Sequence, residues 1–445
     1  MAFKYFPHTE EDIAQMLARI GVKSLDDLYS DVPGELKLGR DYNLPSAMSE
    51  EEVRKEFQRL GDRNIPLVCF AGGGVYDHYT PAVVSSIVSR QEFLTSYTPY
   101  QAEISQGTLQ YIFEYQSMMA DLTGLDVSNA SMYDGTTATA EAMLMAMASQ
   151  KRADRVLISA TVNPAVRRVC KCYALFHGIT LVEVPETNGE TDFTFVDAEL
   201  KKGGVAGVIV GQPNYYGIIE NLEGLSEKCH ATKALLVMNC PASTLSVLKT
   251  PGEWGADIAV GDAQSLGMPM NYGGPYLGYM CTKNALVRKM PGRIVGATTD
   301  TNGQRTFVLT LQAREQHIRR QKATSNICSN EGIMTLFVVV YMSLLGPKGL
   351  REVNRLSYAG AHYLHDRLLE TGKAEDAFGK KTFLNEFCIK TKFDAQAVQA
   401  KLLKEGILAG VSIKGNDGED RLLLAVTERR TKAEMDRLAK LIAEA

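Results

Sequence analysis

The stretch GADIAVGDAQSLGMPMNYGGP, residues 255–275, joins a short apolar strand to small and polar residues and then to a glycine turn. It has the pattern of an enzyme active site from which the reactive residue is missing. No lysine or arginine occurs between Lys249 and Lys283. The stretch therefore raises the question of whether the chain catalyses a reaction or only has the fold of a protein that does.

Short apolar runs rich in β-branched residues recur on both sides of this stretch. Helical periods separate several of them, such as residues 163–178, which end at Gly178. Nearly continuous apolar strands with helices between them predict a mostly parallel sheet that is covered on both faces. The expected strands are residues 155–159, 179–184, 205–211, 234–238, 256–260 and 276–281.

The sequence divides into three parts. Residues 1–60 predict an N-terminal arm with small helices, in which Thr9 and Ser49 act as N-caps. Residues 61–347 predict a large α/β domain. Residues 348–445 predict a small C-terminal α+β domain with strands at 383–390 and 421–426.

Composition excludes several classes of protein. The 445 residues are 45% hydrophobic and 22% charged, which is typical of a globular protein with a large core. A net charge of −4 argues against nucleic acid as the main partner. We expect no membrane association, because residues 334–342 form the longest apolar run. We also expect a cytoplasmic location with reduced cysteines, since no signal peptide is evident.

Motifs for several kinds of chemistry are missing. The eight cysteines are scattered without zinc spacing, and no HExxH motif or serine triad order occurs, so we expect no metal site. The glycine-rich segment at residues 69–79 lacks the spacing of a dinucleotide site and is typical of a tight turn.

Three stretches are candidates for binding. Residues 134–137 (Asp-Gly-Thr-Thr) precede strong helix formers, which predicts an anion cup at a helix N-terminus or a plain N-cap. Residues 93–116 are dense in tyrosine and amide side chains and predict a binding loop or a solvated loop. Residues 310–330 place basic side chains in one helical stretch, which is either a solvated face or an anionic partner's site.

Several motifs together resemble one family, the glycine decarboxylase P-protein of the glycine cleavage system. The motifs are LTSYTPYQAEISQGTLQYIFEYQ, MYDGTTATAEA, GQPNYYG, PGEWGADIAVGDAQSLGMPMNYGGPYLG, MPGRIVGATTD and LQAREQHIRRQKATSNICSN. The resemblance covers nearly the whole chain, and its length fits the first (alpha) subunit of the split enzyme or the N-terminal half of the single-chain enzyme. It implies the pyridoxal-phosphate-dependent transferase-like fold, fold type I.

The chain departs from the lysine-bearing pattern of this family at two positions. Gln264 stands at the position of the lysine that binds the cofactor, and glutamine has no amine with which to do so. Asn239 follows the strand at 234–238, where an aspartate would normally face the pyridine nitrogen. The resemblance therefore implies that this chain has no catalytic residue of its own and is inactive alone.

The resemblance also implies partners and a division of roles. A lysine-bearing beta subunit would hold pyridoxal phosphate in an α2β2 assembly. The pair would bind glycine, release CO2 and pass the aminomethyl group to the lipoyl group of the H-protein. From this chain, we expect Tyr97, Tyr100, Gln101 and Glu103 to line the substrate entrance or interface. We expect Arg314, Thr324, Ser325 and Asn326 to reach the partner's cofactor.

Two alternatives remain open on the sequence. The chain could be an independent pyridoxal phosphate enzyme that uses Lys249 or Lys283. It could instead be a non-catalytic scaffold or regulatory subunit with a vestigial pyridoxal phosphate fold.

Overall fold

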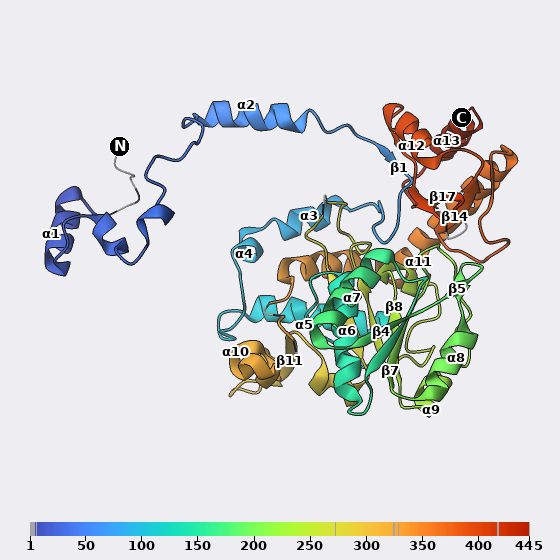
Figure 1. The fold of residues 1–445 in the computed structure, drawn as a ribbon, viewed down its shortest axis with the longest axis horizontal. Coiled ribbons are helices and arrows are strands. Elements are labelled where there is room, and N and C mark those ends of the chain that lie inside the picture. The colour runs from blue at the N-terminus through green and yellow to red at the C-terminus, as the bar shows by residue number, and fades with distance from the viewer. Residues whose placement is uncertain are drawn as a thin grey trace. The chain divides into compact units, whose positions relative to one another are not determined.

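The computed structural model describes residues 5, 7–271, 273–323, 325–327, 329–415 and 418–444. The chain forms two compact units, residues 1–65 and 66–445. In the first unit, Thr9 and Ser49 both form capping boxes, as predicted. Its elements are helix α1 (Glu10–Ile20), 3-10 turns at Leu25–Tyr29 and Gly34–Leu36, and helix α2 (Glu50–Gly61) (Figure 1).

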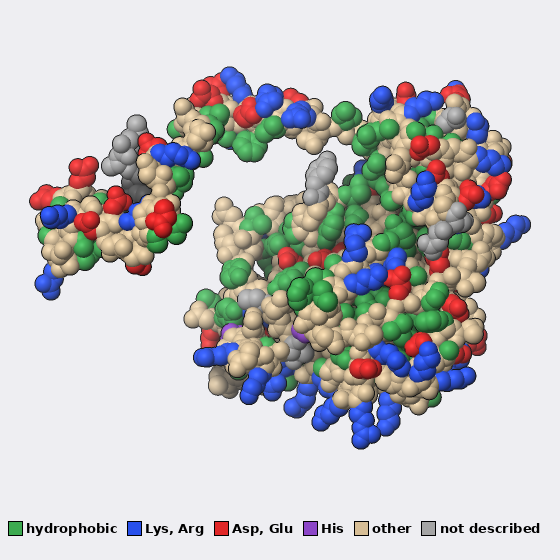
Figure 2. Space-filling model, in the orientation of Figure 1, with side chains coloured by type: hydrophobic (Ala, Val, Ile, Leu, Met, Phe, Trp, Pro, Cys, Tyr) green, Lys and Arg blue, Asp and Glu red, His purple; other side chains and the backbone are tan. Residues whose placement is uncertain are grey.

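The first unit has no core of its own. None of its described residues is buried, and large apolar side chains such as Tyr29, Leu36 and Phe57 are 60%, 73% and 69% exposed. Figure 2 shows hydrophobic side chains on the surface of this unit. Isolated helices of 11 and 12 residues are marginal in water, so this unit gains little stability from its own contacts.

The second unit is built on a seven-stranded sheet of strand order β2-β10-β9-β8-β7-β3-β4. The five strands from β9 to β4 are parallel, and β10 pairs antiparallel with β9 and β2. The predicted strands 155–159 and 205–211 are confirmed residue for residue. The bounds are β2 (Val127–Ser128), β3 (Arg155–Ser159), β4 (Thr180–Val184), β7 (Val205–Gly211), β8 (Leu235–Asn239), β9 (Ile258–Asp262) and β10 (Gly278–Thr282).

Helices cover both faces of this sheet, which explains why its strands are apolar on both sides. Val156 and Ile158 pack with α6 (Gly135–Ser149) and α7 (Pro164–His177), while Leu157 between them packs on the opposite face. That face is covered by α5 (Gln106–Thr123), α8 (Phe193–Lys202), α9 (Leu225–Ala231) and α11 (Gly332–Glu370) (Figure 1). Gly178 ends α7 in a left-handed conformation, as predicted.

A second, antiparallel sheet of four strands lies in the C-terminal part. With α12 (Ala395–Lys404), α13 (Lys432–Ala443) and the end of α11, it encloses a separate apolar core. Its strands are β13 (Ala374–Asp376), β14 (Glu386–Thr391), β16 (Val411–Lys414) and β17 (Asp420–Ala425). Both sheets belong to one compact unit, so the predicted domain boundary at residues 347–348 stays a prediction.

The long helix α11 is bent at the point where the small sheet's part begins. Gly346 has φ 58° and ψ −178°, and Pro347 follows it, so two helices meet there. By length and composition this helix could cross a membrane. However, Leu336, Val338 and Tyr341 are buried in the core of the large sheet, which identifies the apolar half as a core helix.

Shorter elements connect these layers. Strand β1 (Val68–Cys69) pairs with β15 (Ile407–Leu408), and a hairpin is formed by β11 (Ile294–Thr299) and β12 (Arg305–Thr310). The remaining elements are α3 (Ala82–Val88), α4 (Gln91–Leu94), β5 (Glu186–Thr187) and β6 (Glu190–Thr191).

The prediction of one helical stretch within residues 310–330 is wrong. A single helical turn, α10 (Gln316–Arg319), lies between 3-10 turns at Gln312–Arg314 and Arg320–Lys322. Leu311 and Arg320 both have φ 54°, a conformation that interrupts a right-handed helix.

Deletion of residues 1–65 tests the independence of the two units. Because no described side chain in this segment is buried, we expect the midpoint of thermal unfolding to change by less than about 4 °C. Deletion of residues 431–445 is the control, since it removes α13 with its buried Met435, Leu438 and Ile442, and should abolish cooperative unfolding. A large loss of stability on deleting residues 1–65 would contradict the division into units.

Candidate active-site cleft

A cavity of about 690 Å³ lies at the carboxyl ends of the parallel strands. Gly211, Asn239 and Asp262, the last residues of β7, β8 and β9, line it. Ligands bind at this edge in open α/β sheets. Other walls come from residues 73–76, from the N-terminus of α6 and from Glu386, the first residue of β14 in the small sheet.

The predicted anion cup at residues 134–137 is the N-terminus of α6, but two carboxylates already occupy it. Asp134 accepts hydrogen bonds from the Thr137 N–H, at 2.8 Å, and from the Thr136 hydroxyl. Asp262 accepts one from the Gly135 N–H at 3.2 Å. A Cβ on Gly135 would lie 2.8 Å from the Asp262 nitrogen, so glycine is required for this close packing. The plain N-cap predicted as the alternative is therefore present.

Gln264 is buried and its side-chain amide is engaged by backbone groups. The Tyr76 N–H donates to Oε1 at 3.0 Å, and Nε2 donates to the Tyr76 carbonyl at 3.0 Å. The second N–H of the amide donates to the Met268 carbonyl at 2.9 Å. Gln264 is thus a buried, fixed structural link beside Tyr76, which lines the cavity, and it has no amine and uses both of its N–H groups.

Asn239 is likewise held by the protein. Its Nδ2 donates to the Thr139 hydroxyl of α6 at 2.7 Å. An amide at this position carries no negative charge to pair with a protonated ring nitrogen. The two departures inferred from the sequence, at Gln264 and Asn239, are therefore both integrated into the hydrogen bonding of the fold.

Among the described residues, the Asp, Glu, Lys and Arg side chains that line the cavity are all acidic. Asp134, Asp262, Glu331 and Glu386 line it, and no lysine or arginine does so among the described residues. Burial, with a contribution from nearby Asp134, raises the pKa of Asp262 to about 6 against the hydrogen bonds from Gln264 and Gly135. Burial also raises the pKa of Glu386 to about 7. The cavity is thus an unfavourable place for any further negative charge.

The glycine-rich segment at residues 72–79 is attached to the small sheet at one end of the cavity. Glu386 accepts hydrogen bonds from the Gly73 N–H at 2.6 Å and from the Tyr76 hydroxyl at 2.8 Å. A Cβ on Gly72 would lie 2.1 Å from Glu386 Oε1, so glycine is needed there as well. The tight-turn interpretation of this segment omitted its role as a wall of the cavity.

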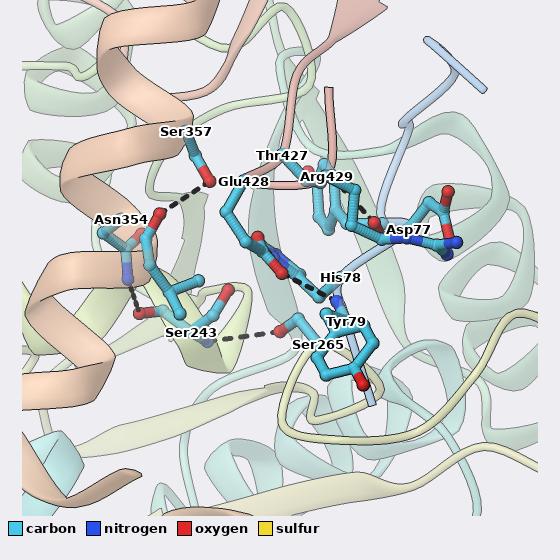
Figure 3. Close-up of polar contacts among 12 residues, drawn as sticks. Asp77, His78, Tyr79, Ser243, Ser265, Asn354, Ser357, Thr427, Glu428 and Arg429 are labelled. Carbon is cyan, nitrogen blue, oxygen red and sulfur yellow. Dashed lines mark hydrogen bonds and ion pairs between the residues drawn. The ribbon is translucent and has the colours of Figure 1, made fainter. Parts of the chain in front are cut away.

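A second set of contacts holds the same segment at residues 77–79 (Figure 3). Glu428 contacts His78 Nδ1 at 2.7 Å and accepts a hydrogen bond from the Tyr79 N–H at 2.7 Å. Asp77 pairs with Arg429 and, at 3.1 Å, with Arg430. Although burial pushes the pKa of Glu428 upward, the hydrogen bond and charge of His78 hold it below its usual value. Residues 72–79 are therefore fixed between the Gln264 loop and the small sheet.

The residues predicted to line the substrate entrance lie outside this cavity. Tyr97, Tyr100, Gln101 and Glu103 are exposed in the segment between α4 and α5, and none of them lines the cavity. Tyr97 is 85% exposed and Tyr100 59% exposed. The structure keeps them together on the surface, so their role at an interface stays a prediction.

Buried Arg293, which motif analysis did not single out, links the two groups of predicted residues. It donates to the Tyr100 hydroxyl at 2.8 Å, and its guanidinium lies 5.0 Å from the centre of that ring. Its Nε is 3.6 Å from Glu315, next to Arg314 in the chain. The motif MPGRIVGATTD contained this arginine, but only burial identifies it.

The residues predicted to reach a partner's cofactor do not all lie in one place. Arg314 donates to the carbonyls of Met290 and Gly292, and burial lowers its pKa. Ser325 and Asn326 line a separate cavity of about 370 Å³ with Glu141, whose pKa burial raises to about 7. Thr324 lies outside the described residues. Contact of this group with a partner's cofactor stays a prediction.

Sheet order, cleft position and small C-terminal sheet define the class of pyridoxal-phosphate-dependent transferase-like proteins of fold type I. The sphingosine-1-phosphate lyase of Burkholderia pseudomallei shares this fold, with a TM-score of 0.69 at 16% identity over 93% of this chain and 94% of the lyase.

Comparison at higher identity gives the family. The model of the glycine cleavage system P-protein matches residues 3–442. Glycine dehydrogenase (decarboxylating) subunit 1 of Carboxydothermus hydrogenoformans is 49% identical over 99% of both chains. An inhibitor-bound crystal structure of glycine decarboxylase (P-protein) matches with a TM-score of 0.91 at 44% identity, over 99% of this chain and 100% of that one. The chain belongs to the glycine cleavage system P-protein family.

The raised pKa of Glu386 predicts a pH dependence of stability. Its carboxyl group stays protonated in the folded chain up to about pH 7 but ionises near its usual pKa when unfolded, so it contributes stability that is lost as pH rises from about 4.5 to 7. We expect Glu386→Gln to reduce the fall in unfolding midpoint between pH 5 and pH 8. Exposed Glu375, whose pKa Lys392 lowers, is the control, because Glu375→Gln should leave that fall unchanged. Equal pH profiles for wild type and Glu386→Gln would refute the assignment.

Proposed function

We propose that this chain is the lysine-lacking subunit of a two-subunit, glycine-decarboxylating enzyme. The lysine-bearing partner holds pyridoxal phosphate covalently, and an α2β2 assembly binds glycine, releases CO2 and passes the aminomethyl group to the lipoylated H-protein. The bound cofactor supplies the electron withdrawal that decarboxylation needs. The observation that carries the proposal is Gln264, which is buried in place of an amine and paired with Tyr76. The cytoplasmic location expected from the sequence stays a prediction.

Neither lysine of the alternative pyridoxal phosphate enzyme supports that reading. Lys249 lies 3.9 Å above the Trp254 ring, and Lys283 pairs with Asp257 at 2.7 Å. Neither lysine lines the 690 Å³ cavity. Related chains named subunit 1 also favour a partner-dependent enzyme over an independent one.

The exposed segment at residues 97–103 is the best candidate for this chain's contribution to the shared site. It carries two phenols, an amide and a carboxylate, which suit contact with the ammonium and carboxylate of glycine or with a lipoyl arm. Arg293 anchors this segment through Tyr100.

Glycine–CO2 exchange tests the division of roles. We expect the isolated chain, and the partner with H-protein alone, to give no exchange above background, and the two chains mixed with H-protein to give exchange. Borohydride reduction of the mixture should attach the cofactor to the partner only. Full activity of the partner alone would contradict the proposal and support a non-catalytic scaffold or regulatory subunit. Labelling of a lysine in this chain would instead support an independent pyridoxal phosphate enzyme.

Substitution of Tyr100 tests the assigned segment. Tyr100→Phe removes the hydroxyl that Arg293 holds, and we expect exchange to fall about three- to tenfold, in line with the net contribution of one ordinary hydrogen bond. Tyr358→Phe, at an exposed tyrosine of α11 that lies outside the cavity, is the matched control and should keep full exchange. Unchanged exchange in both Tyr100→Phe and Glu103→Gln would remove this segment from the site.

A further inference from the structure

The chain's own cleft has the position of a cofactor site, yet the side chains that line it do not fit a phosphorylated pyridine aldehyde. Such a ligand needs free amides for its phosphate, an acid for its ring nitrogen and an amine for its aldehyde. We infer that this cleft is closed to pyridoxal phosphate and to other phosphate-bearing ligands, because Asp134 and Asp262 occupy the Thr137 and Gly135 amides at the N-terminus of α6 and place negative charge there. The inference goes beyond the proposed function, which concerns the partner's site.

Carboxylates already accept hydrogen bonds from backbone amides at the N-terminus of α6. The Gly135 N–H is used by Asp262 and the Thr137 N–H by Asp134, at 3.2 and 2.8 Å. The Thr136 hydroxyl also donates to Asp134. A phosphate at this helix end would have to displace two carboxylates that are held by the fold.

The negative charge of the carboxylates near the N-terminus of α6 also opposes the binding of a phosphate. A helix N-terminus offers an anion about half of an elementary charge, whereas each ionised carboxylate presents a full negative charge. Glu331 stands on the same wall as the two aspartates, and burial together with the charge of Asp134 raises its pKa. The same effects raise the pKa of Asp262 to about 6. This wall already disfavours the negative charge that it carries, and a phosphate dianion would add to it.

The groups that would meet the ring nitrogen and the aldehyde of the ligand are also unsuitable. Asn239 is engaged by Thr139, and the Gln264 amide by Tyr76 and Met268. A ring bound in this cleft would therefore find no acid at position 239 for its nitrogen and no amine at position 264 for its aldehyde.

Calorimetric titration of the full chain with inorganic phosphate and with pyridoxine 5′-phosphate tests the inference. Pyridoxine 5′-phosphate carries the ring and phosphate but has no aldehyde to react with surface lysines. We expect no binding at millimolar concentration by wild type at pH 8. The double variant Asp134→Ser/Asp262→Asn should bind phosphate at least about tenfold more tightly, because serine keeps the helix cap while both charges are lost.

A matched control separates this effect from the general behaviour of helix ends. Asp394 caps α12 by accepting from the Gln396 and Ala397 N–H groups, outside the cleft. Asp394→Ser should gain no phosphate binding. If the double variant does not fold, as judged by circular dichroism, Asp262→Asn alone keeps the Asp134 cap and should show a smaller gain.

Two results would overturn the inference. One is tight binding of either phosphate compound by the wild-type cleft. The other is a folded variant, double or single, that binds phosphate no better than wild type. Neither result depends on exchange activity, so failure of the partner-dependent function is a separate outcome.

Discussion

Two hydrogen bonds between the Gln264 side chain and the Tyr76 backbone hold the cleft in its observed form. They join the loop after β9 to residues 72–79, and Glu386 joins the same residues to the small sheet. Without this link, Tyr76 would lose two backbone partners inside a buried region, which is costly. The position predicted from the sequence to carry the amine in a lysine-bearing relative is therefore used here to connect the two sheets.

At the N-terminus of α6, the residue that stabilises the helix also prevents the helix end from binding an anion. A carboxylate that caps a helix contributes about 1 kcal/mol to stability, and Asp134 makes this contribution at α6. The same carboxylate removes the helix end as an anion site. Polar and aromatic groups free to act are found instead on the surface, in the exposed segment that Arg293 anchors.

The sequence predicts those elements that depend on residues close together in the chain. Residues 155–159 and 205–211 were predictable to the residue because a buried parallel strand is a continuous apolar run, whereas β9 ends two residues later than predicted because Asp262 still pairs within the sheet. The cup at Asp134 was visible in sequence, but its second carboxylate comes from a position 127 residues away. Glu386 and Gly73 are 313 residues apart, so only the fold reveals their contact.

The Gln264 link also bears on whether the chain could regain catalysis by mutation. A lysine at position 264 would supply an amine but would leave the Tyr76 carbonyl and N–H without their present partner, and two aspartates would still fill the phosphate position. Several substitutions would have to occur together before any of them brought an advantage. On this structure, no single substitution supplies both an amine and a free phosphate position.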